Sequence, residues 1–266
     1  MVSKSASSQQ LIDCYSDQAE HFGQTREKAW PEFTYIMQAV ELFQSDNLTS
    51  TGGLKECKVV DLGCGTGRIY SFLQANEFLR ISYTGVDIAP WMITQAQKNY
   101  PKAKRVVDDM LHYVQNLEQE SVDIIIWVAS VQHLMSPKQR KLFFSYSYRA
   151  LRRWGVFLMT NWSYSSWFLK NYWRQQIVAG VRSLISSSRH RNDLAIPWKD
   201  PNYKNNRKLF RRHYHMFTLH ELHQLARLGW FVIAQSWYVL QDGSLVDTGR
   251  KRARNTWMLL EKAVAN

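Results

Sequence analysis

The stretch VVDLGCGTGR, residues 59–68, decides the fold of this 266-residue chain. Its glycines Gly63, Gly65 and Gly67 follow an apolar, strand-like run and precede a helical segment that begins at Arg68. Glycines so placed let the backbone turn tightly and lie close to a bound nucleoside. The G-x-G-x-G spacing differs from the G-x-G-x-x-G of dinucleotide sites, where the third glycine packs a helix around a pyrophosphate. The stretch therefore predicts a nucleoside-binding turn between a strand and a helix.

Acidic residues near the strand ends indicate which nucleoside binds. Asp61 would place a carboxylate at the end of the first strand, which suits the ammonium group of a cationic ligand. Asp87 ends the next strand, where an acidic residue hydrogen-bonds ribose hydroxyls. Asp109 and Met110 offer an acceptor for an amino group and an apolar surface for a purine. These features together predict S-adenosylmethionine as the cofactor. The expected cofactor residues are Asp61, Gly63, Gly65, Gly67, Asp87, Ile88, Asp109, Met110 and Ala129.

Strand-like and helical segments alternate around this turn. The expected strands are 57–62, 82–87, 105–108, 121–129 and 156–161, and the helices between them are 68–76, 90–99 and 137–153. Helices at 8–22 and from Trp30-Pro31 onward precede the first strand, and a helix at 218–228 with strands at 230–240 and 256–261 closes the chain. This order predicts an α/β fold with a doubly wound, mostly parallel sheet, and the final hairpin indicates seven strands. The glycine turn resembles the first motif of class I methyltransferases, whose sheet ends in the same hairpin, so the resemblance implies a sheet of that type.

The alternation is interrupted after the fifth strand. Residues 162–216 are basic and aromatic, with a helix expected at 168–185 and a loop-like stretch after it. An irregular segment of that length in a compact domain is usually functional or disordered. We therefore expect one methyltransferase domain over 1–266. Its parts are an N-terminal helical cap (1–53), a cofactor-binding half (54–161), this basic insertion (162–216), and a last helix with a C-terminal β-hairpin (217–266).

The positive charge of the chain is concentrated in its C-terminal part. Residues 1–150 hold 15 Lys/Arg and 16 Asp/Glu (15 − 16 = −1), whereas residues 151–266 hold 19 and 6 (19 − 6 = +13). Such a basic half favours a phosphate-rich partner over a merely solvated surface. An anionic membrane surface is one such partner, but the interleaved Tyr, Phe and Trp are more typical of binders of single-stranded RNA.

Composition excludes several other classes of protein. Hydrophobic residues make up 45% of the chain, which is too many for a disordered protein. The longest apolar stretch, 122–131, is too short to span a membrane, and the N-terminal residues lack the apolar run of a signal peptide. The 3 cysteines have neither a CxxC nor a Cys/His metal spacing. We expect a cytoplasmic protein with no disulfides, no metal site and no membrane partner.

Several segments resemble the eukaryotic tRNA wobble-uridine carboxymethyl methyltransferases. The N-terminal segments YSDQAEHF (15–22) and TREKAWP (25–31) are similar to the signature of that family, and WVASVQHL (127–134) is similar to its substrate-side motif. The matching later segments are DLAIPW (193–198), RHYHMF (212–217) and NTWMLLEK (255–262). Gln132 replaces the first of two adjacent histidines of the family, and two segments, residues 162–192 and 242–254, are longer than in the family.

The resemblance implies methyl esterification of the carboxylate of 5-carboxymethyluridine, or a related acid, at the tRNA wobble position. A carboxylate is already anionic at neutral pH, so the reaction needs no catalytic base. Arg26 is the candidate that would orient this carboxylate, because a guanidinium binds carboxylates in fixed geometry. His133 is a second catalytic candidate, with a hydrogen-bonded structural histidine as the equal alternative. The candidate RNA contacts are Tyr214, His215, Arg211, Arg212, Arg250, Lys251 and Arg252.

The expected partner is the anticodon arm of tRNA. Enzymes of the family that the chain resembles also work with a small zinc-binding activator subunit, and the sequence does not decide whether this chain needs one. Two alternatives stay open. The chain could be a class I methyltransferase that acts on a small carboxylic acid or phenol, with incidental charge. It could also be a non-catalytic RNA-binding adaptor with a vestigial cofactor loop, although the intact Asp61, Gly63, Gly65, Gly67 and Asp87 argue against this.

Overall fold

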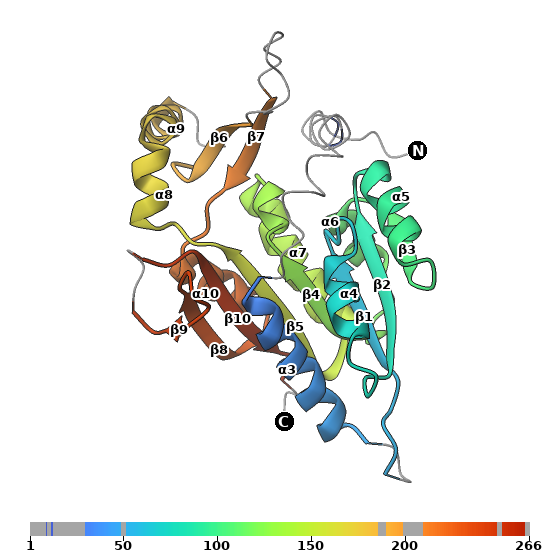
Figure 1. The fold of residues 1–266 in the computed structure, drawn as a ribbon. Helices are drawn as coiled ribbons and strands as arrows, with labels where there is room; N and C mark the ends of the chain where they lie inside the picture. The colour runs from blue at the N-terminus through green and yellow to red at the C-terminus, as the bar shows by residue number, and fades with distance from the viewer. Residues whose placement is uncertain are drawn as a thin grey trace.

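A computed structural model describes Gln9, Ile12 and residues 30–48, 52–185, 190–198, 210–248 and 252–263 of the chain. Its centre is an eight-stranded sheet in the order β3-β2-β1-β4-β5-β10-β8-β9 (Figure 1). The strands are β1 (Cys57–Leu62), β2 (Ile81–Asp87), β3 (Lys104–Val107), β4 (Val122–Val128), β5 (Leu151–Trp162), β8 (Val232–Val239), β9 (Leu245–Val246) and β10 (Asn255–Glu261). The first five strands are parallel, and β10 pairs antiparallel with β5 and β8.

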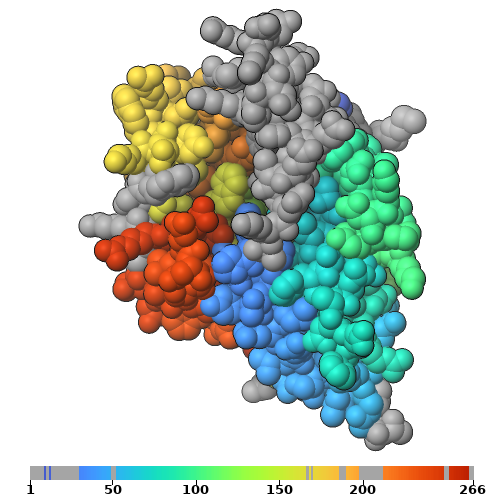
Figure 2. Space-filling model, in the orientation of Figure 1, coloured from blue at the N-terminus to red at the C-terminus, as the bar shows by residue number. Residues whose placement is uncertain are grey.

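Helices cover both faces of this sheet. They are α3 (Glu32–Asp46), α4 (Arg68–Gln74), α5 (Pro90–Asn99), α6 (Met110–Asn116), α7 (Pro137–Ala150) and α10 (Leu219–Leu228), with a short 3-10 helix η1 (Val131–His133) after β4. Figure 2 shows α3, in blue, between the C-terminal strands and the cofactor-binding half. The doubly wound, mostly parallel fold is therefore confirmed, and the two-residue β9 adds one strand to the seven expected.

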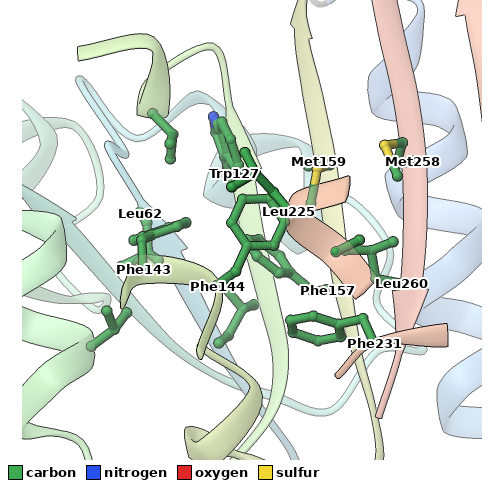
Figure 3. Packing of buried hydrophobic residues seen from close by; sticks show 14 of the residues in the cluster. Leu62, Trp127, Phe143, Phe144, Phe157, Met159, Leu225, Phe231, Met258 and Leu260 are labelled. Carbon is green, nitrogen blue, oxygen red and sulfur yellow. The ribbon is translucent and has the colours of Figure 1, made fainter. Parts of the chain in front are cut away.

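Trp127 lies at the centre of the larger hydrophobic core (Figure 3). It is fully buried on β4, and its ring contacts Phe143, Phe144, Phe157 and Phe217 at centroid distances of 5.6–6.1 Å. Burial of each large aromatic side chain contributes about 1.5–3 kcal/mol. A second core on the opposite face packs α3 and α4 against β1. The two cores hold the carboxyl ends of the parallel strands in fixed positions.

The chain after β5 forms a separate layer. Helices α8 (Ser166–Asn171) and α9 (Trp173–Ile185) pack with a two-stranded antiparallel sheet of β6 (Asp193–Trp198) and β7 (Phe210–His215). In Figure 1 this layer lies beyond the ends of β4 and β5, on the same side as α5. The His133 ring, in η1, approaches the His213 carbonyl oxygen of β7 at 3.2 Å. The insertion therefore faces the carboxyl edge of the sheet.

Several expected element boundaries are wrong. The helix expected at 137–153 ends at Ala150, since residues 151–153 already belong to β5. The helix expected at 168–185 is two helices separated at Tyr172. The loop-like stretch contains the β6–β7 hairpin, and α6 follows β3 where no helix was expected. Only Gln9 and Ile12 of the helix expected at 8–22 are described, and both are helical.

Within the described residues, no helix is both long and apolar enough to cross a lipid bilayer.

Candidate active site

Hydrogen bonds hold the glycine turn after β1 against β2. The amides of Gly63 and Cys64 both donate to the Val86 carbonyl oxygen, at 2.7 and 3.0 Å. Gly63 has a φ of +79°, and a Cβ atom there would lie 2.3 Å from the Cβ of Ser130. Ser130, just after β4, donates its hydroxyl to the Leu62 carbonyl oxygen at 2.7 Å. Glycine is required at position 63 because two neighbouring strand ends meet there.

Gly65 provides room for a ligand above this turn. It has a φ of +53°, and among the described residues, its two chain neighbours aside, no atom lies within 4 Å of a Cβ atom built there. Its amide donates to Asp87 Oδ2 at 2.9 Å, and the Ala89 amide donates to Asp87 Oδ1 at 2.9 Å. Burial raises the pKa of Asp87, while these backbone hydrogen bonds partly oppose the rise. Asp87 therefore joins the end of β2 to the glycine turn.

Asp61 lies beneath the turn rather than on its open side. Its side chain is buried and accepts a hydrogen bond of 2.5 Å from the Tyr83 hydroxyl. Burial raises the pKa of Asp61 to about 7, with opposing contributions from that hydrogen bond and from the charge of Arg105. The Arg105 guanidinium lies 5.1 Å from the Tyr83 ring centroid and 5.2 Å from that of Tyr70. Nothing in the local sequence pattern of Tyr83, Tyr70 or Arg105 marks them as neighbours of Asp61, so they were not predicted.

The remaining expected cofactor residues lie at the same edge. Asp109 follows β3 and caps α6, accepting the amides of Leu111 at 2.9 Å and His112 at 3.3 Å through Oδ1. Met110 opens that helix and packs against the larger core. Ala129 follows β4 with a φ of +48°. With half-buried Ile88 after β2, the whole expected set is brought to the carboxyl ends of neighbouring strands.

His133 and Tyr214 meet across the interface between the sheet and the insertion. Their ring centroids lie 4.8 Å apart, and Tyr214 also contacts Trp162 at 5.2 Å. Tyr214 is 1% exposed, so its ring mainly packs the insertion onto η1. The guanidinium group of Arg212, another candidate RNA contact, lies over the Tyr214 ring, with its Cζ atom 5.2 Å from the ring centroid. Two residues far apart in the sequence thus come together at the edge expected for the acceptor.

His215, expected among the RNA contacts, is fully buried and engaged inside the protein. Its Nδ1 lies 2.6 Å from Asp193 Oδ1, and its Nε2 lies 2.8 Å from Glu221 Oε1. Arg140 also reaches Glu221, at 3.5 Å. Burial opposes a charge on His215, but the hydrogen bonds that its ring makes to Asp193 and Glu221 outweigh this effect and raise the pKa of the imidazole. These contacts make His215 a structural tie between the hairpin and α10.

The other expected contacts are described only in part. Arg252 is exposed, and Arg211 is placed by its backbone in β7, opposite Pro197. Arg26, Arg250 and Lys251 lie outside the described residues. In the described part of the chain, no group of three or more His, Cys, Asp or Glu side chains is arranged to hold a metal ion.

Comparisons with known proteins agree with this geometry. Residues 59–155 match the family model of a methyltransferase domain. Malonyl-[acyl-carrier protein] O-methyltransferase of a Paenibacillus species is 30% identical over 117 residues, which span 42% of this chain and 41% of that protein. The chain thus covers less than half the length of this curated relative.

Solved structures share the fold at low identity. A SAM-dependent methyltransferase from Methanosarcina mazei has a TM-score of 0.59 at 19% identity, covering 82% of this chain and 100% of its own. The 1,6-didemethyltoxoflavin-N1-methyltransferase of Burkholderia thailandensis, with bound S-adenosylhomocysteine, has a TM-score of 0.56 at 15% identity over 96% of this chain and 88% of its own.

A third solved structure is the complex between the Haloferax volcanii Trm112 methyltransferase activator and a methyltransferase. It has a TM-score of 0.59 at 13% identity, over 95% of this chain and 98% of its own. This protein shares its fold with solved SAM-dependent methyltransferases, and its residues 59–155 match the family model of a methyltransferase domain. The fold, the family match and these relatives support S-adenosylmethionine as the cofactor and methyl transfer as the class of reaction.

Proposed function

We propose that this protein transfers the methyl group of S-adenosylmethionine to a carboxylate, and that the carboxylate belongs to a 5-carboxymethyluridine-type wobble base of tRNA. The observation that carries the proposal is the convergence at one sheet edge. The open glycine turn and Asp87 lie there, and η1 and the insertion face the same edge with the His133–Tyr214 pair.

The residues present fit the cofactor. The space that the described residues leave beside Gly65 supports a ligand close to the backbone, and Asp87 at the end of β2 is assigned to the ribose hydroxyls. Asp61, once ionised, supplies a negative charge beneath the turn for the cationic amino-acid portion. When bound, the cofactor supplies an electrophilic methyl group on a sulfonium. The task of the chain is then to align an acceptor oxygen with that methyl and to exclude water.

A carboxylate acceptor suits a site without an evident general base. With a pKa near about 4 the acceptor is anionic at neutral pH, so its oxygen forms the new O–CH3 bond without releasing a proton. The curated relative supports this chemistry by its name, since the free nucleophilic oxygen of a malonyl thioester is a carboxylate. We assign Arg26 to hold one carboxylate oxygen, and His133 to contact the acceptor beside Tyr214.

The basic C-terminal part supports tRNA as the carrier of that carboxylate. Residues 151–266 hold 19 Lys/Arg and 6 Asp/Glu, and the insertion that lies over the acceptor edge belongs to this part. Arg211, Arg212, Arg250, Lys251 and Arg252 are the proposed phosphate contacts. The second candidate acceptor is a carboxylate on a small molecule or an acyl carrier, which the named substrate of the curated relative favours.

An activator subunit is also part of the proposal. One solved structure of this fold is a complex with the Trm112 methyltransferase activator. In this chain β3 is the outer strand at one end of the sheet, and Val107 on it is 45% exposed. A small zinc-binding protein would cover such an apolar edge strand.

The decisive experiment is methyl transfer from labelled S-adenosylmethionine to tRNA stripped of its own methyl ester. We expect label that mild alkali releases as methanol, and its loss in Arg26→Ala but not in the exposed control Arg153→Ala. Base-stable label would reject carboxyl methylation. If tRNA stays unlabelled with the zinc-binding activator present, while a malonyl thioester is labelled, the second acceptor is correct.

A further inference from the structure

Helix α9 presents its large apolar side chains outward. Trp173, Ile177, Val181 and Leu184 are 54%, 57%, 51% and 86% exposed, and they recur at helical spacing along one stripe. The opposite face of the helix packs inward through the small side chain of Ala179, which is buried with Leu194, Ile196 and Tyr214. This arrangement reverses the usual pattern of a surface helix, in which the apolar stripe faces the core.

The stripe is wider than these four residues and lies at the outer side of the molecule. Val178 and Ile185 extend it, at 49% and 81% exposed. Figure 1 shows α8 and α9 on the outer flank of the β6–β7 hairpin, away from the central sheet, and Figure 2 shows this part of the chain at the surface. An exposed apolar patch of this kind marks a contact surface.

The charged residues of the helix itself are all positive. Arg174 and Arg182 are exposed on the same helix, and Arg174 lies over the Trp173 ring at 5.3 Å. From residue 162 to residue 192 the sequence has five basic residues and no Asp or Glu. The surface that covers this helix must therefore offer both negative charge and an apolar interior.

We propose that α9 is a membrane-contact helix that lies in the headgroup region of an anionic lipid surface, with Trp173, Ile177, Val181 and Leu184 inserted toward the acyl chains. A helix with bulky apolar residues, an aromatic residue and flanking arginines has the composition of such interfacial helices. Each arginine near an anionic surface adds to the attraction. The inference goes beyond methyl transfer and does not depend on which acceptor is correct.

The charge pattern argues against the other occupants. A second copy of this helix would bring Arg174 and Arg182 close to their own counterparts, and like charges repel in a shared interface. RNA is recognised through stacking rings and cations, whereas Ile177, Val181 and Leu184 are aliphatic. A lipid surface satisfies both the aliphatic stripe and the arginines.

The test uses the full chain and vesicles. We expect it to sediment with vesicles of phosphatidylcholine containing about 30 mol% phosphatidylglycerol, and much less with pure phosphatidylcholine. The variant Ile177→Ser/Val181→Ser/Leu184→Ser should lose at least about tenfold in partitioning, because it removes the inserted apolar area. The variant Arg174→Gln/Arg182→Gln should lose about fivefold per arginine.

The matched control is Leu42→Ser/Phe78→Ser/Leu228→Ser, which removes three exposed apolar side chains from other parts of the surface. It should sediment as the wild type does. Circular dichroism and methyl-transfer activity of the stripe variant show that the chain is folded. Sedimentation unaffected by the stripe variant, equal sedimentation with both vesicle types, or a wild-type dimer that the stripe variant dissociates would each overturn the proposal.

Discussion

The Asp61 carboxyl is 1% exposed, and burial raises its pKa to about 7. If the ionised carboxylate binds the ammonium group of the cofactor, cofactor affinity should rise with pH, by up to about tenfold per unit below pH 7. Asp61→Asn should bind the cofactor weakly and without this pH dependence. Isothermal titration of S-adenosylhomocysteine between pH 5.5 and 8.5 measures both curves. Parallel curves for the two proteins would reject the role of Asp61.

The same residue should oppose stability at high pH. A carboxyl with a folded pKa of about 7 and an ordinary value of 3.8 holds its proton more tightly in the folded chain. Its stabilising contribution is therefore complete below pH 3.8 and is lost as the pH rises through 7. Asp61→Asn removes that loss, so above pH 7 the variant should unfold at a higher temperature than the wild type. The affinity of the site for its cofactor is thus gained at the expense of stability.

Gly63 and Gly180 form a matched pair for a second prediction. An alanine at position 63 would have to adopt a φ of +79°, and its Cβ atom would lie 2.3 Å from the Cβ atom of Ser130. Because both effects are unfavourable, Gly63→Ala should lower the free energy of unfolding by about 3 kcal/mol. Gly180 lies in α9, and among the described residues, its chain neighbours and the backbone of the helix aside, nothing lies within 4 Å of a Cβ atom built there. Gly180→Ala should therefore raise the free energy of unfolding by about 0.5–1 kcal/mol. Urea unfolding measures both. Equal effects would mean that the turn is not held against Ser130.

At the scale of elements, the β6–β7 hairpin is tied to the main domain through charges. His215 on β7 binds Asp193 on β6 and Glu221 on α10, while Arg140 on α7 reaches Glu221 and the His190 ring lies 5.5 Å from that of His215. These hydrogen bonds raise the pKa of His215 above its ordinary value of 6.5, although burial opposes them. Carboxylate oxygens lie against both ring nitrogens, an arrangement in which a protonated imidazole can donate to each of them.

This tie predicts a pH-dependent docking of the hairpin. Because the folded pKa of His215 is raised, its contribution to stability is complete below pH 6.5 and is lost as the pH rises through the folded value. His215→Phe should cost about 2 kcal/mol at pH 6 and less at pH 9. Hydrogen exchange of the β6–β7 amides at both values measures this. His223→Phe is the control, since burial lowers the pKa of His223, and its cost should not decline with rising pH.

The elements differ in how far the sequence reveals them. The strand β1, the glycine turn and the strand β4 were predicted because their apolar runs and glycines are local signals. The hairpin was not predicted, since Pro197 argues against a strand and β7 reads FRRHYH, with the buried polar residue His215 in place of an apolar one. The end of α7 was misplaced because the sequence has no stop signal at Ala150, and Gly155 lies inside β5.

The residues of the candidate site also divide into those that the sequence predicts and those that it does not. Gly63, Gly65 and Asp87 were predicted from spacing, and the structure brings them together. Tyr83 and Arg105 beneath the turn were missed, because their proximity to Asp61 arises from strand register and not from their own neighbours in sequence. Contacts between side chains on neighbouring strands cannot be predicted from the local sequence pattern alone.

At the scale of the whole molecule, the first half of the chain is almost neutral and the second half is strongly positive. This difference predicts that the cofactor and the acceptor respond differently to salt. The net charge is −1 over residues 1–150 and +13 over 151–266, from 15 − 16 and 19 − 6. The cofactor edge belongs to the first half, and the insertion that faces it belongs to the second. Acceptor binding should therefore depend on salt, whereas cofactor binding should not.

Binding of tRNA through about six phosphate contacts should weaken by about 10³-fold between about 50 and 200 mM salt. Over the same range the dissociation constant for S-adenosylhomocysteine should barely change. The exposed residues Arg191 and Arg252 lie in the basic half, so Arg191→Gln/Arg252→Gln should reduce the slope of log affinity against log salt by about 2. Lys98→Gln, an exposed change in the neutral half, should leave it unaltered. Filter binding measures the slopes; a salt-independent affinity for the acceptor would instead identify a small molecule as the acceptor.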